Sequence, residues 1–170
     1  PQKSFQDHYP DILAHCYGCG RLNEFGHQIK SYWDGEESVC HFLPNEKHIA
    51  IPGYVYGGLL ASLVDCHGTG TAAAAAYRAE GRSMVSDPPL RFLTASLHVD
   101  YLKPTPLGVE LEVRGRVKEL KGRKVVIEAV RRATLEQAEA LARLAGKETG
   151  PGRVDDKTTK NRLCSTKTPG

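Results

Sequence analysis

Hydrophobic and polar residues alternate along several stretches of this chain, the pattern of strands that bury one face and expose the other. The alternating stretches cover residues 26–34, 38–43, 91–101, 109–120 and 124–132. Two neighbouring pairs of stretches are separated by Asp34-Gly35 and by Lys121-Gly122-Arg123, which favour tight turns. The pattern therefore predicts an antiparallel sheet whose successive strands have short connections.

A helical pattern interrupts these stretches at residues 57–80. The residues spaced as a buried helix face are Leu59, Leu60, Leu63 and Val64. Alanines fill the second half, and Gly81 stands where a C-cap is favoured. Gly68 and Gly70 each cost about 1 kcal/mol relative to alanine, so we expect either close packing against a neighbouring backbone or a break there. The expected fold is α+β, a curved antiparallel sheet around one long helix.

The two ends of the chain differ from this central pattern. Residues 1–25 lack clear periodicity and are expected to pack on the core, with a short helix around residues 6–16. Residues 26–146 form the expected domain, which ends in a helix that starts at Thr134. Residues 147–170 contain lysine, threonine, glycine and proline with few apolar residues, so we expect a flexible tail.

Composition excludes several classes of protein. The 170 residues suit one domain, and the longest apolar run, Ala72–Tyr77, is too short to span a bilayer. A net charge of +3, with acidic residues among the basic ones, does not indicate nucleic-acid binding. Five cysteines without a secretion signal predict free thiols. Cys16 and Cys19 form a single Cys-x-x-Cys, too little to predict a metal site, and we expect a cytoplasmic protein with no cofactor and no membrane partner.

Gly57, Gly58 and Asp65 form the strongest candidate site. Paired glycines let a substrate carbonyl approach the backbone, and the first N–H groups of a helix have no partner inside the helix and lie at its positive end. They can hold an oxyanion. Aspartate is a poor helix former, so Asp65 among apolar residues suggests catalysis. The alternatives are a structural ion pair for Asp65 and plain close packing for the glycines.

Gly57 and Asp65 cannot act on one carbonyl within a single chain. Eight residues of α-helix advance about 12 Å and turn about 80° net of whole turns. If both groups act together, Asp65 comes from a second copy whose helix lies antiparallel across a twofold axis. The predicted assembly is therefore a homodimer, or a pair of dimers.

The sequence resembles the hotdog-fold acyl-CoA thioesterases, especially the small phenylacetate-pathway type, over roughly residues 16–132. In that family His-Gly-Gly is followed seven positions later by Asp, where this chain has Tyr56-Gly57-Gly58 and Asp65. Thr94 stands seven positions before the Tyr of Tyr-x-x-Pro, as the family's hydroxyl residue does. The Cys-x-x-Cys-Gly segment from Cys16 is also similar, and in many relatives it is structural rather than metal-binding. Two departures are Tyr56 for the usual His and Ala50 for an Asn or Gln.

The resemblance implies hydrolysis of an acyl-CoA thioester. The Gly57 N–H would stabilise the oxyanion, the partner's Asp65 would act as base or nucleophile, Tyr56 and Gly58 would contact substrate, and Thr94 would orient Asp65 or water. Thr94 as a plain strand residue is the alternative for that position. Two other functions remain open: a non-catalytic acyl-CoA binding protein, and a hotdog hydratase or dehydratase.

Overall fold

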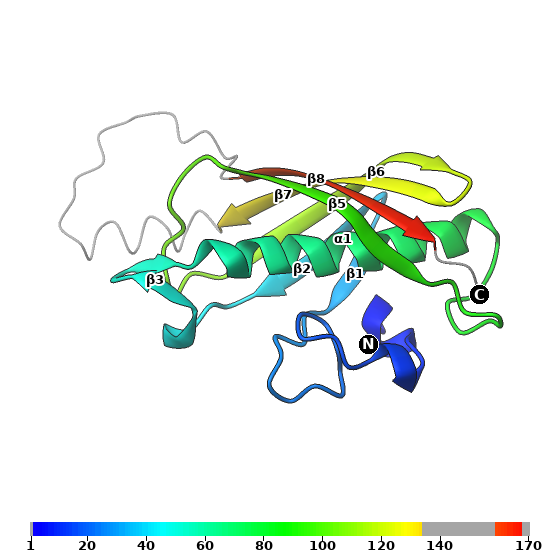
Figure 1. The fold of residues 1–170 in the computed structure, drawn as a ribbon, viewed down its shortest axis with the longest axis horizontal. Coiled ribbons are helices and arrows are strands. Elements are labelled where there is room, and N and C mark those ends of the chain that lie inside the picture. Colours follow the sequence, from blue (N-terminus) through cyan, green and yellow to red (C-terminus); the bar gives the residue numbers. More distant parts are fainter. Residues whose placement is uncertain (1, 134–158, 168–170) are drawn as a thin grey trace.

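The computed structural model describes residues 2–133 and 159–167 as a six-stranded antiparallel sheet and one long helix. The elements are η1 (Phe5–His8), η2 (Asp11–Leu13), β1 (Ser31–Asp34), β2 (Glu37–Phe42), η3 (Glu46–His48), β3 (Ile49–Ile51), β4 (Tyr54–Val55), α1 (Gly57–Ala79), β5 (Phe92–Tyr101), β6 (Leu111–Lys121), β7 (Lys124–Ala133) and β8 (Thr159–Lys167). The strand order is β1-β2-β6-β7-β8-β5, and β3 and β4 pair in a separate two-stranded sheet. Figure 1 shows α1 between the strands and the N-terminal segment, which agrees with the expected α+β fold.

Helix α1 is buried on most of its surface. Its leucines and Val64 pack against Val113 and Ala129 of the sheet, while the alanines from Ala72 onward contact the other end of the same sheet. A helix that is apolar all round must be covered on every side, and here the sheet and the N-terminal segment cover it. The prediction of one helix from Gly57 is confirmed, and it continues without a break to Ala79.

Close packing explains the two glycines in the middle of α1. A Cβ at Gly68 would lie 3.1–3.3 Å from side-chain atoms of Leu163 in β8, and one at Gly70 would lie 3.0 Å from Gln6 Nε2. The neighbours are side chains of the same chain, so our expectation of a neighbouring backbone was wrong. Glycine lets β8 and the N-terminal segment approach the helix more closely than alanine would.

The C-terminal segment corrects one of our predictions. Residues 159–167 form β8, which lies between β7 and β5, so the expected flexible tail over residues 147–170 is wrong for this part. Leu163 is fully buried, and Ser165 is buried beside it in the strand. The compositional argument failed because it counted apolar residues, whereas β8 is held by pairing along both of its edges as well as by the buried Leu163. The expected helix from Thr134 lies outside the described residues.

The N-terminal segment contains two short 3-10 helices where one helix was expected. The Ser4 side chain accepts the Asp7 N–H, and Asp7 in turn accepts the Ser4 N–H, so η1 has a capping box. The Phe5 ring lies 5.2 Å from the Trp33 ring, and Gln6 bonds Ser31 at both its N–H and its hydroxyl. These contacts hold the segment against β1 and α1. Among the described residues, no helix is long and apolar enough to cross a membrane.

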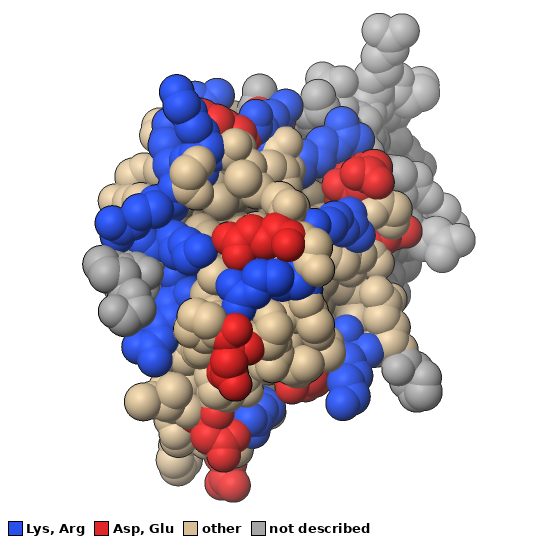
Figure 2. Space-filling view, turned by 90° about the vertical axis from the view of Figure 1, so that its right-hand side faces the viewer, with Lys and Arg blue, Asp and Glu red and all other residues tan. Residues whose placement is uncertain are grey.

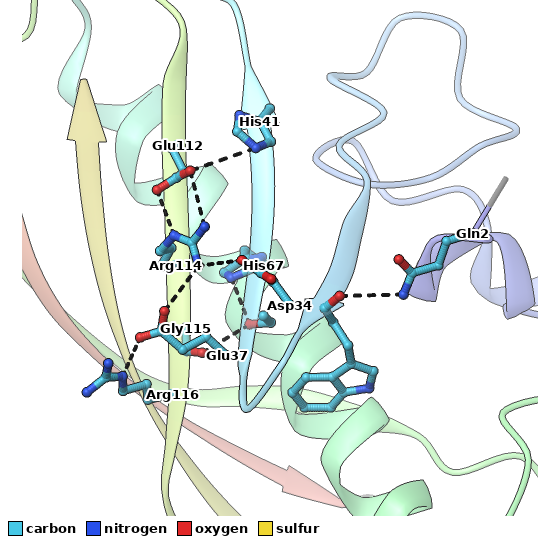
Figure 3. Close-up of polar contacts among 11 residues, drawn as sticks. Gln2, Asp34, Glu37, His41, His67, Glu112, Arg114, Gly115 and Arg116 are labelled. Carbon is cyan, nitrogen blue, oxygen red and sulfur yellow. Dashed lines mark hydrogen bonds and ion pairs between the residues drawn. The ribbon is translucent and has the colours of Figure 1, made fainter. Parts of the chain in front are cut away.

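The outer face of the sheet carries charges of both signs. Figure 2 shows acidic and basic side chains interspersed over the face it draws. Arg114 of β6 donates to Glu112 at 2.7 Å, to Asp34 at 2.8 Å and to Glu37 at 3.1 Å, which links β1, β2 and β6 (Figure 3). Burial alone raises the pKa of Glu37, but hydrogen bonds from Arg116 and Arg114 lower it overall. This network of ion pairs connects the three strands on the solvent-exposed face of the sheet.

His67 of α1 lies on the opposite, buried side of the same strands. Its Nδ1 lies 3.0 Å from the Ser31 hydroxyl and its Nε2 lies 3.0 Å from the Ser38 hydroxyl, so both ring nitrogens are satisfied. The Thr71 hydroxyl donates to the His67 carbonyl at 2.8 Å. Desolvation by burial lowers the pKa of His67 to about 4. The imidazole is therefore neutral at pH 7, and its two hydrogen bonds connect α1 to β1 and β2.

Removal of β8 should unfold the protein. A chain ended before Thr159 loses the pairing partners of both β7 and β5 and uncovers α1 at Gly68, so we expect no cooperative thermal transition near that of the full chain. A chain ended after Lys167 is the matched control and should melt like the full chain. Differential scanning calorimetry of the three proteins is the measurement. An unchanged melting temperature without β8 would contradict the observed strand order.

His67 should make stability fall in mild acid. Its pKa is about 4 in the folded chain and 6.5 in the reference state. Between pH 6.5 and pH 4 the His67 imidazole is protonated in the unfolded chain but neutral in the folded chain. The contribution of the neutral imidazole to the free energy of unfolding is therefore complete above pH 6.5 and is lost as the pH falls to 4. The loss is roughly 3 kcal/mol at about 1.36 kcal/mol per pKa unit.

Urea unfolding of wild type and His67→Gln between pH 7 and pH 4 measures this contribution, because the other titrating groups are common to both proteins. The wild type should lose more stability than the variant over that interval. If His67→Gln does not fold, NMR titration of the wild-type imidazole replaces it. A native pKa near 6.5 would refute the account.

Candidate functional site

Asp65 accepts a hydrogen bond from Thr94, which is in turn bonded to Thr69. The Thr94 hydroxyl of β5 donates to Asp65 Oδ1. Thr69, one turn along α1 from Asp65, has its hydroxyl 3.0 Å from that of Thr94. Because Thr94 has a single hydroxyl proton and gives it to Asp65, Thr69 donates to Thr94. The chain of bonds orients the carboxylate through Oδ1. Our reading of the sequence missed Thr69, although its i+4 spacing from Asp65 was a signal.

A pocket of about 680 Å³ opens beside this carboxylate. Asp65, Thr69 and Thr94 line one part of it, and the remaining wall comes from the N-terminal segment, α1 and the start of β5. The apolar side chains of this wall include Leu13, Ala73, Met84, Leu90, Phe92 and Leu93. A largely apolar cavity with a few convergent polar groups is the usual form of a small-molecule site.

The start of α1 forms a separate feature of the same helix. Tyr56 precedes the first helical residue and is half-exposed, and its ring folds over Gly58, where a Cβ would lie 1.9 Å from the tyrosine hydroxyl. The Tyr101 hydroxyl of β5 donates to the Gly57 carbonyl at 2.9 Å. A Cβ at Gly57 would make only ordinary contacts at 3.5–3.7 Å with the Tyr101 ring. A Cβ at Gly58 would therefore displace the Tyr56 ring, whereas one at Gly57 would displace nothing.

The five predicted site residues fall into two groups. Asp65 and Thr94 meet at the pocket, whereas Tyr56, Gly57 and Gly58 lie at the helix start and do not line it. Since α1 is a regular helix over this interval, Gly57 and Asp65 are separated by about 12 Å along its axis. One chain therefore carries the two halves of the predicted site apart from each other, as the spacing predicted.

Three thiols meet at the pocket wall. The Sγ atoms of Cys16, Cys19 and Cys66 all lie within 4.8 Å of one another. Hydrogen bonds from the Cys19 and Cys66 thiols lower the pKa of Cys16 far below its ordinary value, and the hydrogen bond to Cys16 raises the pKa of Cys19 to about 12. The sequence indicated the first two residues only, because Cys66 lies 50 positions from Cys16.

Comparison with known proteins places this arrangement in a family. Residues 52–133 match the model of the thioesterase superfamily. A thioesterase superfamily protein from Shewanella loihica is 40% identical to this chain. The match covers 95% of this chain and 100% of that protein, with a TM-score of 0.62. The smu.793 protein of Streptococcus mutans, whose structure was solved bound to acetyl CoA, is 14% identical to this chain. The match covers 87% of this chain and 96% of that protein, with a TM-score of 0.59.

A curated relative matches over a shorter stretch. The acyl-coenzyme A thioesterase THEM4 of Xenopus laevis is 34% identical over 87 residues, which are 51% of this chain and 33% of that protein. The chain therefore spans about a third of the length of this relative.

Proposed function

Because this chain belongs to the thioesterase superfamily, we propose that it hydrolyses acyl-CoA thioesters to the free acid and coenzyme A. The membership confirms the resemblance drawn from the sequence, and the sheet wrapped around one helix is the expected hotdog fold. The observation that carries the proposal is the Asp65 carboxylate, oriented by Thr94 at the wall of an apolar pocket. The apolar pocket can hold the acyl group of the substrate, and the carboxylate can act as the base or the nucleophile of the hydrolysis.

The substrate class rests on chemistry and on the relatives together. Leu13, Met84 and Phe92 offer an apolar lining that takes up an acyl chain or ring. The Xenopus relative is named an acyl-coenzyme A thioesterase, and the Streptococcus protein of similar fold was solved with acetyl CoA. Coenzyme A is a thiol, so hydrolysis releases a leaving group that is easily detected.

Asp65 performs the central step. As a general base it takes a proton from water while the water oxygen attacks the thioester carbonyl carbon. As a nucleophile it attacks that carbon itself and forms an anhydride that water then cleaves. Both routes expel the coenzyme A thiolate from a tetrahedral intermediate and need an ionised carboxylate. The bonds from Thr69 through Thr94 to Oδ1 leave the other carboxylate oxygen for this task.

The oxyanion of that intermediate needs a donor that the same chain does not bring to Asp65. We assign it to the Gly57 N–H at the start of α1 in a second copy, placed antiparallel. Strand β5 supports this assembly, since it is an end strand of the described sheet and carries the Thr94 that binds Asp65. Leu93 and Tyr101 on β5 are 64% and 53% exposed. Apolar side chains that a dimer buries are exposed in this way when one subunit is considered alone.

Tyr56 takes the place of the family histidine. Imidazole is the side chain suited to carrying protons near neutral pH, so in this chain the Tyr56 hydroxyl serves to position the substrate instead. The substitution also favours the second candidate function, a non-catalytic acyl-CoA binding protein on the same fold.

Asp65→Asn should abolish hydrolysis without unfolding the protein. The amide keeps the shape of the carboxylate but is neither base nor nucleophile, so kcat should fall on the order of 10²–10⁴-fold. Release of free thiol from a panel of acyl-CoA esters is the measurement, with melting temperature and CoA affinity as checks. Asp34→Asn is the matched control, because that carboxylate lies on the outer face of the sheet. Equal activity in the two variants would refute the role of Asp65.

Variants at Tyr56 separate the enzyme from the binding protein. Tyr56→Phe removes one positioning hydroxyl and should lower the rate by roughly tenfold at most. Tyr56→His should raise turnover only when Asp65 is present. If wild type and Tyr56→His bind CoA but hydrolyse nothing, the chain is a binding protein.

A further inference from the structure

The thiols of Cys16, Cys19 and Cys66 form a cluster built from two distant parts of the chain. Cys16 and Cys19 belong to the turn before β1, whereas Cys66 belongs to α1, next to Asp65. The Sγ atoms of Cys16 and Cys66 are 3.7 Å apart, and all three lie within 4.8 Å of one another. The thioesterase chemistry of Asp65 uses none of them.

Backbone hydrogen bonds fix the turn that carries Cys16 and Cys19. The Gly20 N–H donates to the Cys16 carbonyl at 2.7 Å and closes the turn, and the Ile29 N–H donates to the Gly18 carbonyl at 3.1 Å. The two thiols are therefore held on one closed turn.

The close packing of the turn leaves no room for a Cβ at Gly18 or Gly20. A Cβ at Gly18 would lie 2.3 Å from Cys66 Sγ, and one at Gly20 would lie 2.5 Å from the Cys16 N and from the Ala14 carbonyl oxygen. The backbone at Gly18 therefore passes directly over Cys66, which brings the turn close enough for three sulfurs to converge. The convergence follows from how the turn packs on α1.

The spacing of the sulfurs matches a zinc ion. A Zn–S bond of about 2.3 Å in a tetrahedral site places ligand sulfurs about 3.8 Å apart. The observed separations of 3.7 Å for one pair and up to 4.8 Å for all three need only small side-chain rotations to reach this value. A disulfide would bring two sulfurs to about 2.05 Å and leave the third thiol without a role.

We propose that Cys16, Cys19 and Cys66 bind one Zn²⁺ as thiolates at the wall of the pocket. Thiolate sulfur selects zinc over the hard divalent cations. All three cysteines line the pocket, so the fourth tetrahedral position is filled from it, by water or by a small ligand. The ion ties the N-terminal turn to α1 one residue from Asp65.

Metal titration of the full-length chain tests the site. The protein is reduced, stripped with a chelator and titrated with Co²⁺, whose bonds to thiolates give intense near-ultraviolet charge-transfer absorption, and then with Zn²⁺ in competition with a chelating dye. Wild type should bind one ion per chain. Cys16→Ser and Cys66→Ser should weaken Zn²⁺ binding by at least the 10–100-fold that loss of an outer-shell partner costs. Cys164→Ser, a thiol of β8 outside the cluster, is the matched control and should bind like wild type.

Folding of each variant is checked by circular dichroism, and Cys16 is exposed, so its serine variant is the safer of the two. Equal Zn²⁺ affinity in Cys16→Ser and Cys164→Ser would overturn the proposal. So would the absence of thiolate charge-transfer absorption in wild type, or a Cys16–Cys66 disulfide in protein prepared with zinc present. The readout is metal binding, so it stands whether or not the chain hydrolyses thioesters.

Discussion

Burial of α1 over most of its surface is the constraint on which the rest of the structure depends. A helix this apolar is stable only if other elements cover most of it, and the chain has few elements to do so. The curved sheet covers one side and the N-terminal segment another, with Gly68 and Gly70 allowing Leu163 and Gln6 to approach. The same coverage places β5 beside Asp65 and the Cys16 turn beside Cys66. Both the carboxylate site and the thiol cluster thus follow from how the helix is enclosed.

The sequence predicted the parts of the fold that depend on local pattern. Alternation marked β2, β5, β6 and β7, and helical spacing marked α1 close to its observed ends. It failed at β8, because the docking of this strand depends on a gap between β7 and β5 that a composition argument cannot see. Strands β3 and β4 were missed for a similar reason, since two- and three-residue strands carry too few positions for a period to show.

The candidate site was predicted in part for the same physical reasons. Asp65 stood out because aspartate is a poor helix former, and Thr94 because its spacing from Tyr101 matches the family pattern; the structure brings the two together. Thr69 was missed, since a threonine in a helix has many explanations. Cys66 was missed as a member of the thiol cluster, and its neighbour His67 is enclosed by Ser31 and Ser38. Long-range convergence such as that of the thiols cannot be read from spacing along the chain.

The central claim is that one active site uses Gly57 of one copy and Asp65 of another. Gly57→Pro removes the N–H and adds a ring whose Cβ would make only ordinary contacts with Tyr101. Proline is favoured at the first helical position, and Tyr56 already has the extended conformation that a residue before proline requires. Each homodimer, of Gly57→Pro or of Asp65→Asn, should be nearly inactive. A heterodimer of the two, isolated with two different tags, has one site with both groups intact. Steady-state thioester hydrolysis should recover to about half the wild-type rate per dimer, given one residue from each chain per site. A heterodimer no more active than the two homodimers would contradict the shared site.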